Sequence, residues 1–268
     1  MLLFGLNVIG FNHRYNFENK MTDIKIPINM GEMVSSGKGT SSIVDDFMYG
    51  SNVAQAHIYI RMGFLRKVYG ILSMQLLLTV VIASITLFTP TVRFYISEND
   101  WMLTVAFLLS LVLLVALMVK SRQTPLNYIL LTAFTFAEAY TVSVVVTFYD
   151  QLAVLQAFVL TMAVTIGLTL YTFQSKRDFS TWGAGLFSML WILIVAGILQ
   201  IFVGSTELEL LLSVGGAVLF SFFIIYDSHM IMHRLSPEDY ILATIDLYLD
   251  IINLFLHILR IIGSAKNR

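Results

Sequence analysis

Four acidic side chains lie inside long hydrophobic runs of the sequence and are the first candidates for chemistry. They are Glu138, Asp227, Asp246 and Asp250. An ionised carboxylate in the middle of a bilayer costs several kcal/mol, so such a residue usually faces other helices or a water-filled cavity and has a partner there. A hydrogen-bonded structural acid is the alternative. For Glu138, alone in TFAEAYTV, both interpretations stay open, whereas for Asp227 and Asp250 we favour a functional role.

The last hydrophobic run carries its polar residues at a regular spacing. They are Asp246, Asp250, Asn253, His257 and Arg260, separated by four, three, four and three positions. This spacing puts all of them on one face of an α-helix. We interpret this polar stripe as facing other helices or a water-filled path. An amphipathic helix lying in the membrane interface would show the same periodicity, but the other faces of this run are more uniformly apolar than is usual for such helices.

Asp227 and Asp250 are separated by one short loop and about half a helix on the last run. Two antiparallel helices joined in this way can bring the two carboxyl groups into contact. Because like charges in a low-dielectric site cannot both ionise cheaply, we expect the pair to share a proton and to titrate as a unit. Gain or loss of the proton, or its replacement by a cation, would alter the link between the helices, which predicts a pH-sensitive gate.

Carboxylate oxygens are also ligands for hard cations such as Ca²⁺. Two carboxylates fall short of the about six to eight oxygens of a tight calcium site. We therefore expect Asp227 and Asp250 to bind Ca²⁺ weakly, as a conduction path requires, and we expect no tightly bound cofactor.

The composition of the whole chain indicates a membrane protein. Hydrophobic residues make up 57% of the chain and charged residues 12%, and the mean hydropathy is +0.81, values that do not suit a globule with a wetted surface. The formal net charge of -1 gives no reason to expect a nucleic-acid partner. The chain has no cysteine, which excludes disulfides, thiolate metal sites and cysteine nucleophiles.

Seven hydrophobic runs meet or approach the about 20 residues that a bilayer core of about 30 Å requires. They are residues 68–88, 101–119, 128–148, 152–173, 182–202, 208–231 and 241–262. Short connections make consecutive helices antiparallel neighbours and leave no room for an extramembrane catalytic domain. We therefore expect an all-α integral membrane protein that is not an enzyme.

The chain divides into two parts by composition. Residues 1–66 are soluble-like, and the polar stretch 31–42 (GEMVSSGKGTSS) predicts a disordered cytosolic tail. Met21 opens a polar segment and is an alternative start. Residues 67–268 form the predicted membrane domain.

Basic residues near the ends of the runs predict the orientation. Those that fall on one side are Arg61, Arg66, Lys67, Lys120, Arg122, Lys176, Arg177 and Arg234. The opposite ends carry Arg93 beside Glu98, Asp100, Asp150, Glu207 and Glu209. The N-terminus is therefore expected in the cytosol.

The last run departs from this charge distribution. A full span would leave Arg260, Lys266 and Arg268 on the acidic, lumenal side. A topology of six spans with a re-entrant last segment would return these residues to the cytosol. The length of the run favours seven spans, and both topologies stay open at this point.

Two further patterns lie around the loop before the last run. His229 and His233 are four residues apart but lack the third ligand and intervening Glu of a helical zinc site, so we interpret them as a solvated cytosolic pair. Ser236 followed by Pro237 has the composition of a helix N-cap and first turn, which predicts a helix start there.

Four glycines are interpreted as points of close helix packing: Gly183, Gly185, Gly215 and Gly216.

The sequence also resembles a known family over most of its length. Residues 224–260, IIYDSHMIMHRLSPEDYILATIDLYLDIINLFLHILR, closely resemble the signature of the transmembrane Bax-inhibitor-motif (lifeguard) family. Supporting strings are IRMGFLRKVYGILSMQLLLT at 60–79, VKSRQTPLNYILLTAFTFAEAYTVSVVVTFYD at 119–150 and LTLYTFQSKRDFSTWGAGLFSMLWIL at 168–193. The strings are most similar to the Golgi anti-apoptotic (fourth lifeguard) branch, and the match runs from about residue 54 to the end.

The resemblance implies a fold of two three-helix layers around a central seventh helix. It maps the paired aspartates of the family to Asp227 in IIYD and Asp250 in LYLD, and implies a basic latch residue near the end of the second helix, here Lys120 or Arg122. Glu138, which we add on membrane cost, would lie on the route of the ion from the lumen.

The implied activity is a pH-sensitive calcium leak from Golgi or endoplasmic-reticulum stores, with suppression of apoptosis. The implied partners are lipid, calcium ions, protons, and apoptosis regulators or intracellular calcium channels.

Other functions fit parts of the pattern. A proton-coupled cation transporter could use the same carboxyl pair, and a non-conducting regulator of calcium channels or apoptosis proteins also stays open. An intramembrane aspartyl protease would need a Gly-x-Gly-Asp string, which the sequence lacks. A G-protein-coupled receptor matches in helix number alone, without the disulfide cysteines, the Asp-Arg-Tyr string or the Asn-Pro turn.

Overall fold

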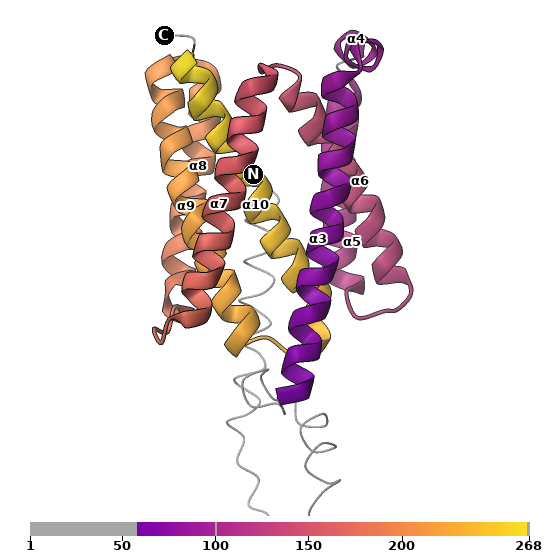
Figure 1. Cartoon of the computed structure of the whole chain (residues 1–268). Helices are drawn as coiled ribbons and strands as arrows, with labels where there is room; N and C mark the ends of the chain where they lie inside the picture. The colour runs from indigo at the N-terminus through magenta and orange to yellow at the C-terminus, as the bar shows by residue number, and fades with distance from the viewer. Residues whose placement is uncertain (1–57, 100, 267–268) are drawn as a thin grey trace, which may run out of the picture.

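The computed structural model describes residues 58–99 and 101–266 of the chain, and these residues are helical with short connections and no strand (Figure 1). The helices are α3 (Ile58–Phe88), α4 (Pro90–Glu98), α5 (Trp101–Lys120), α6 (Leu126–Val146), α7 (Gln151–Gln174), α8 (Gly183–Val203), α9 (Thr206–His233) and α10 (Tyr240–Lys266), with short 3₁₀ turns η1 (Ser180–Trp182) and η2 (Pro237–Asp239). Helices satisfy every backbone hydrogen bond within the segment, as a bilayer interior demands.

Seven of the described helices are long and apolar enough to cross a membrane, and they correspond to the seven predicted runs. The largest difference is at α3, which begins at Ile58 instead of Val68, so residues 58–66 belong to the first helix and not to the tail. Residues 1–57, the rest of the predicted tail, lie outside the described residues.

The bundle has two layers with α10 between them. On one side α6 packs against α3 and α5, and on the other α9 packs against α7 and α8, while α10 packs against α9, α7 and α3 (Figure 1). In its most apolar stretch 78% of α10 is buried, compared with 17% to 56% for the other six membrane helices. The predicted arrangement of two three-helix layers around the last helix is confirmed.

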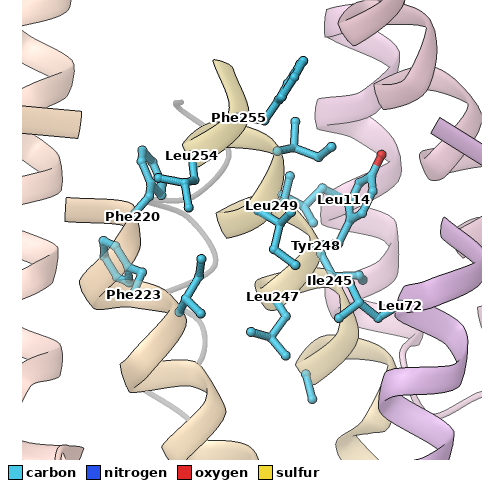
Figure 2. Close-up of a cluster of buried hydrophobic side chains, with 14 of the residues drawn as sticks. Leu72, Leu114, Phe220, Phe223, Ile245, Leu247, Tyr248, Leu249, Leu254 and Phe255 are labelled. Carbon is cyan, nitrogen blue, oxygen red and sulfur yellow. The ribbon is translucent and has the colours of Figure 1, made fainter. Parts of the chain in front are cut away.

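Packing around the middle of α10 joins the two layers. Figure 2 shows Phe220 and Phe223 of α9 on one side of α10, and Leu72 and Leu114 on the other, around the buried Tyr248. Lipid tails are as apolar as these side chains, so close van der Waals contact is what holds the helices together here.

The end of α10 lies at the face of the bundle opposite to the start of α3. Lys266 forms an ion pair with Asp150 in the α6–α7 connection, and Arg260 pairs with Glu209 in the first turn of α9, at 3.6 Å. Both partners belong to the acidic set of the sequence, so α10 passes through the whole bundle (Figure 1). This geometry agrees with seven spans and not with a re-entrant last segment.

Two local predictions at helix ends have different outcomes. The Ser236 hydroxyl accepts a hydrogen bond from the Glu238 N–H and Pro237 opens η2, which confirms the predicted helix start. Helix α4 was not predicted, because its nine residues are too few to span and lie between two longer runs. The Arg93 guanidinium donates to the Thr147 carbonyl and so ties α4 to the end of α6.

The four glycines interpreted as packing points divide into two kinds. A Cβ on Gly183 would lie 2.7 Å from the Tyr226 hydroxyl, and one on Gly216 would lie 2.3 Å from the His257 ring. No atom lies within 4 Å of a Cβ built on Gly185 or Gly215. The prediction is confirmed for the first two glycines and wrong for the other two.

Candidate functional site

The last two membrane helices carry the candidate site along their common interface. Helices α9 and α10 run antiparallel, joined through η2, so residues early in α9 meet residues late in α10. Glu209 and Asp227 mark the two ends of the α9 stretch that meets the polar stripe of α10, through Arg260 and Asp250 respectively.

Asp227 and Asp250 lie in contact deep in this interface. Asp250 has 0% of its surface exposed, and Asp227 is half-buried. Neither carboxylate oxygen of Asp250 receives a hydrogen bond from an N–H or hydroxyl donor of the described residues. The group within hydrogen-bonding reach is the carboxyl of Asp227. Two carboxylates have no hydrogen to donate, so this contact is a hydrogen bond only when one of them carries a proton.

Asp246 lies one helical turn before Asp250 and interacts with it electrostatically. It is half-buried, at the side of the pair that faces the loop between α9 and α10. The three carboxyl groups therefore form one site, in which Asp246 and Asp227 are half-buried and Asp250 is fully buried.

The rest of the polar stripe also lies against protein. Asn253 donates to the Leu249 carbonyl of its own helix at 2.7 Å. The His257 ring, 6% exposed, stacks on Phe220 of α9, and Arg260 reaches Glu209 at the end of the interface. The stripe thus faces α9, as expected for a helix inside the bundle.

The latch candidates lie elsewhere. The Arg122 guanidinium binds the Asp239 carboxylate through two hydrogen bonds of 3.0 and 3.1 Å, and reaches Glu238 at 3.7 Å. This fork ties the α5–α6 connection to η2, directly before α10. Lys120 ends α5, and no contact between Lys120 and the aspartate pair is found among the described residues.

Glu138 lies in the other layer, away from the aspartate pair. It is 7% exposed and lies near Ser110 of α5. It also interacts electrostatically with Tyr248 of α10, whose hydroxyl lies 2.9 Å from the Thr79 hydroxyl. The structure does not bring Glu138 to the α9–α10 interface, and Tyr248 is the side chain that connects it to the central helix.

A second polar network, between α3 and α6, was not predicted from the sequence. Gln75 of α3 donates to the Thr135 hydroxyl of α6 at 2.8 Å, and its carbonyl oxygen has no hydrogen-bond partner among the described residues. The signal was present, because polar residues recur in the first, second and third hydrophobic runs. Their meeting depends on how each helix is rotated, which a single run does not reveal.

The histidine pair differs from its prediction. His229 is only 5% exposed, so the expectation of a solvated pair is wrong for this residue. Its ring stacks on His233 at 4.5 Å and meets the edge of Phe179 at 5.6 Å. No group of three or more metal-ligating side chains occurs in the described part of the chain.

A charged cluster holds this end of α9. Asp178 accepts from the Ser180 N–H and from Arg234, and lies 3.6 Å from His229. The Ser180 hydrogen bonds and the Arg234 charge lower the pKa of Asp178 to about 2. Asp178 in the α7–α8 connection is therefore an anionic anchor for the end of the helix that carries Asp227.

Comparison with known proteins identifies the family of the chain. The family described as "Inhibitor of apoptosis-promoting Bax1" matches residues 61–267. The chain belongs to this family. It is 53% identical over 232 residues to protein lifeguard 4 of Mus musculus, covering 87% of this chain and 98% of that protein.

Two other relatives show the breadth of the family. The chain is 52% identical over 228 residues to the Golgi anti-apoptotic protein of Vaccinia virus (strain Lister), covering 85% of this chain and 96% of that protein. It is 40% identical over 225 residues to Bax inhibitor 1 of Schizosaccharomyces pombe, covering 84% and 85%. The resemblance stated from the sequence strings is confirmed.

Proposed function

We propose that this protein is a pH-sensitive calcium leak channel of Golgi or endoplasmic-reticulum membranes, gated by Asp227 and Asp250, and that it acts as an anti-apoptotic regulator. The observation that carries the proposal is the buried contact between two carboxyl groups on adjacent helices of the bundle. A buried carboxyl pair needs a compensating proton or cation, and either one can link α9 to α10.

The proposed gate works through the number of protons on the pair. With one proton, the carboxyl of one residue donates to the carboxylate of the other. With none, two charges about 4 Å apart repel by about 4 kcal/mol at an effective dielectric constant of about 20. With two, neither group carries a charge to strengthen the bond. The link between α9 and α10 is therefore strongest in the singly protonated state, and pH changes its strength.

Calcium is the proposed permeant ion. The pair and the neighbouring Asp246 offer hard carboxylate oxygens along one face of α10, which suits a divalent cation that binds weakly and moves on. We propose no tightly bound cofactor and no enzyme activity.

The proposed orientation places the N-terminus in the cytosol. The predicted lumenal charges of the last helix are paired with acids, Arg260 with Glu209 and Lys266 with Asp150. These pairs reduce the net positive charge at that face and support the seven-span orientation. The proposed compartment and the link to apoptosis rest on what the names of the relatives say, and apoptosis regulators or calcium channels are proposed partners.

The test is calcium flux from liposomes that contain the purified protein, measured across a range of pH. Asn replaces Asp without changing the side-chain shape, and its amide donates to the remaining carboxylate whatever the pH. Asp227→Asn and Asp250→Asn are therefore expected to abolish the pH dependence of the flux. Glu207→Gln, which removes an exposed acid from the start of α9, is the matched control and is expected to keep it. If both Asp variants keep the flux and its pH dependence, the gate assignment is wrong.

A proton-coupled cation exchanger is the second candidate, because a pair that holds one proton can trade that proton for a cation. The same liposomes separate the two functions. Saturable calcium movement with a stoichiometric proton countercurrent would identify the exchanger, whereas flux down the calcium gradient without a countercurrent supports the leak. A protein that conducts nothing at any pH would be a regulator of other channels.

A further inference from the structure

An aromatic layer lies in the α9–α10 interface between the aspartate pair and the end of α10. The His257 ring lies nearly parallel to that of Phe220, with 5.6 Å between ring centroids and 24° between planes. The two side chains are 6% and 0% exposed. Arg260 and Glu209, one turn farther along, are 42% and 44% exposed. The aromatic layer therefore separates a solvent-accessible ion pair from the buried acids.

Gly216 is the seat of the His257 ring. A Cβ at this position would lie 2.3 to 2.6 Å from three atoms of the imidazole, a distance that no real contact reaches. Only glycine lets the ring lie flat against the α9 backbone. A Cβ built on the adjacent Gly215 would have no neighbouring atom within 4 Å, so only Gly216 of these two glycines lies in close contact with α10.

Packing holds the ring in place more than hydrogen bonding does. The Nδ1 atom of His257 is buried and has no hydrogen-bond partner among the described residues. The ring can leave its seat without breaking a bond at this atom. Displacing it would open the polar stripe at Asn253, which lies one turn nearer to Asp250.

We propose that the His257 side chain, seated on Gly216 and stacked on Phe220, is a seal that closes the α9–α10 interface between the Arg260 end of the bundle and the aspartate pair. Its consequence for calcium flux rests on the proposed function. The seal itself is a steric property and is measured without flux. It adds to the aspartate pair a second barrier that is set by ring packing and not by a shared proton.

The natural absence of cysteine makes a direct accessibility test simple. Asn253→Cys places a thiol between the seal and the aspartate pair. The protein is reconstituted in liposomes, and molecules with the C-terminus outside are counted by protease removal of a tag added after the last residue. A membrane-impermeant methanethiosulfonate added outside then reports access from the Arg260 end.

The seal predicts slow labelling of the thiol at position 253 in the otherwise unchanged protein. His257→Ala is expected to speed labelling about tenfold or more, because a thiol that the ring shields from the Arg260 end reacts slowly until the ring is removed. His257→Phe, which keeps a ring of similar size, is expected to stay slow. A fast His257→Phe would show that the polar character of the imidazole, and not its bulk, makes the barrier, and would overturn the proposal.

The two glycines supply a matched pair of variants. Gly216→Ala must displace the ring and is expected to speed labelling, whereas Gly215→Ala is expected to have no effect. In the His257→Ala background, Gly216→Ala should add nothing further, because the clash has gone; this non-additivity separates ring displacement from general disruption of α9. Equal labelling rates for all variants would overturn the seal.

Flux measured on the same liposomes separates this inference from the proposed function. If labelling follows the ring but no variant conducts calcium, the seal stands and the channel proposal fails. If Asp227→Asn and Asp250→Asn alter the flux as expected while labelling ignores the ring, the channel proposal stands and the seal fails.

Discussion

The two hydrogen bonds between Arg122 and Asp239 form a fork that we expect to hold the start of α10 in place. Asp239→Asn removes the charge of the acceptor and one arm of the fork. Asp239 has a side chain only 11% exposed, but Arg122 is 41% exposed, so solvent screens the pair. Hydrogen bonds to charged groups contribute about 1.5 to 3 kcal/mol when buried and exposed ion pairs about 0 to 1, which places this fork at about 1 to 2 kcal/mol.

The assay is the calcium leak from liposomes at one fixed pH. If the fork exists only in the closed state, losing about 1 to 2 kcal/mol multiplies the open fraction by about 5 to 30. Asp239→Asn is therefore expected to raise the leak by that factor. The double variant with Arg122→Gln should leak no more than Arg122→Gln alone, because Arg122→Gln already removes the contact with Asp239. Lys176→Gln, which removes an exposed basic charge in the α7–α8 connection, is the control.

Two results would refute this reasoning. A leak that Asp239→Asn leaves unchanged would mean that the fork has the same strength in the open and closed states. Effects of the two single variants that add in the double variant would mean that each residue acts through a different partner, so the fork would not be the clamp.

Two further predictions concern the end of α9 that leads to Asp227. The pKa of Asp178 is lowered to about 2, so its contribution to stability is present above the unfolded value of about 3.9 and is lost as the pH falls through about 2; Asp178→Asn should therefore change thermal stability equally at about pH 5 and about pH 8 and leave the pH profile of the leak unchanged. Gly183→Ala would place a Cβ 2.7 Å from the Tyr226 hydroxyl and is expected to lower the free energy of unfolding by about 1 to 3 kcal/mol, measured by denaturation in detergent, whereas Gly185→Ala, with no atom within 4 Å, should have little effect.

The sequence was sufficient to predict the membrane helices because each one is a property of its own segment. Length and hydropathy locate a span, and the spacing of Asp250 and His257 locates a face. The short helix α4 was missed because hydropathy does not mark a nine-residue helix that is too short to span a bilayer. The start of α3 at Ile58 was missed because the helix continues into a segment with polar composition.

The candidate site was predictable where two helices are joined by a short loop, and less so elsewhere. The contact of Asp227 with Asp250 follows from an antiparallel pair with one polar face. The partner of Arg122 does not, because it depends on how one layer of the bundle lies against η2. The burial of His229 depends on Phe179, which arrives from a different loop. Rotation and contact between non-adjacent helices are tertiary properties, and they decide these cases.

The two ion pairs at the end of α10 have a consequence for how the protein is made. Glu209 in the first turn of α9 and Asp150 in the α6–α7 connection precede α10 in the chain, so during synthesis they reach their side of the membrane before Arg260 and Lys266 do. In the proposed orientation, the last helix carries its basic end across the bilayer, against the usual preference of Lys and Arg for the cytosolic side. The two acids that reach that side first can form ion pairs with these cations as they arrive. The order of the helices along the chain thus favours insertion of α10 after the other helices of the bundle are in place.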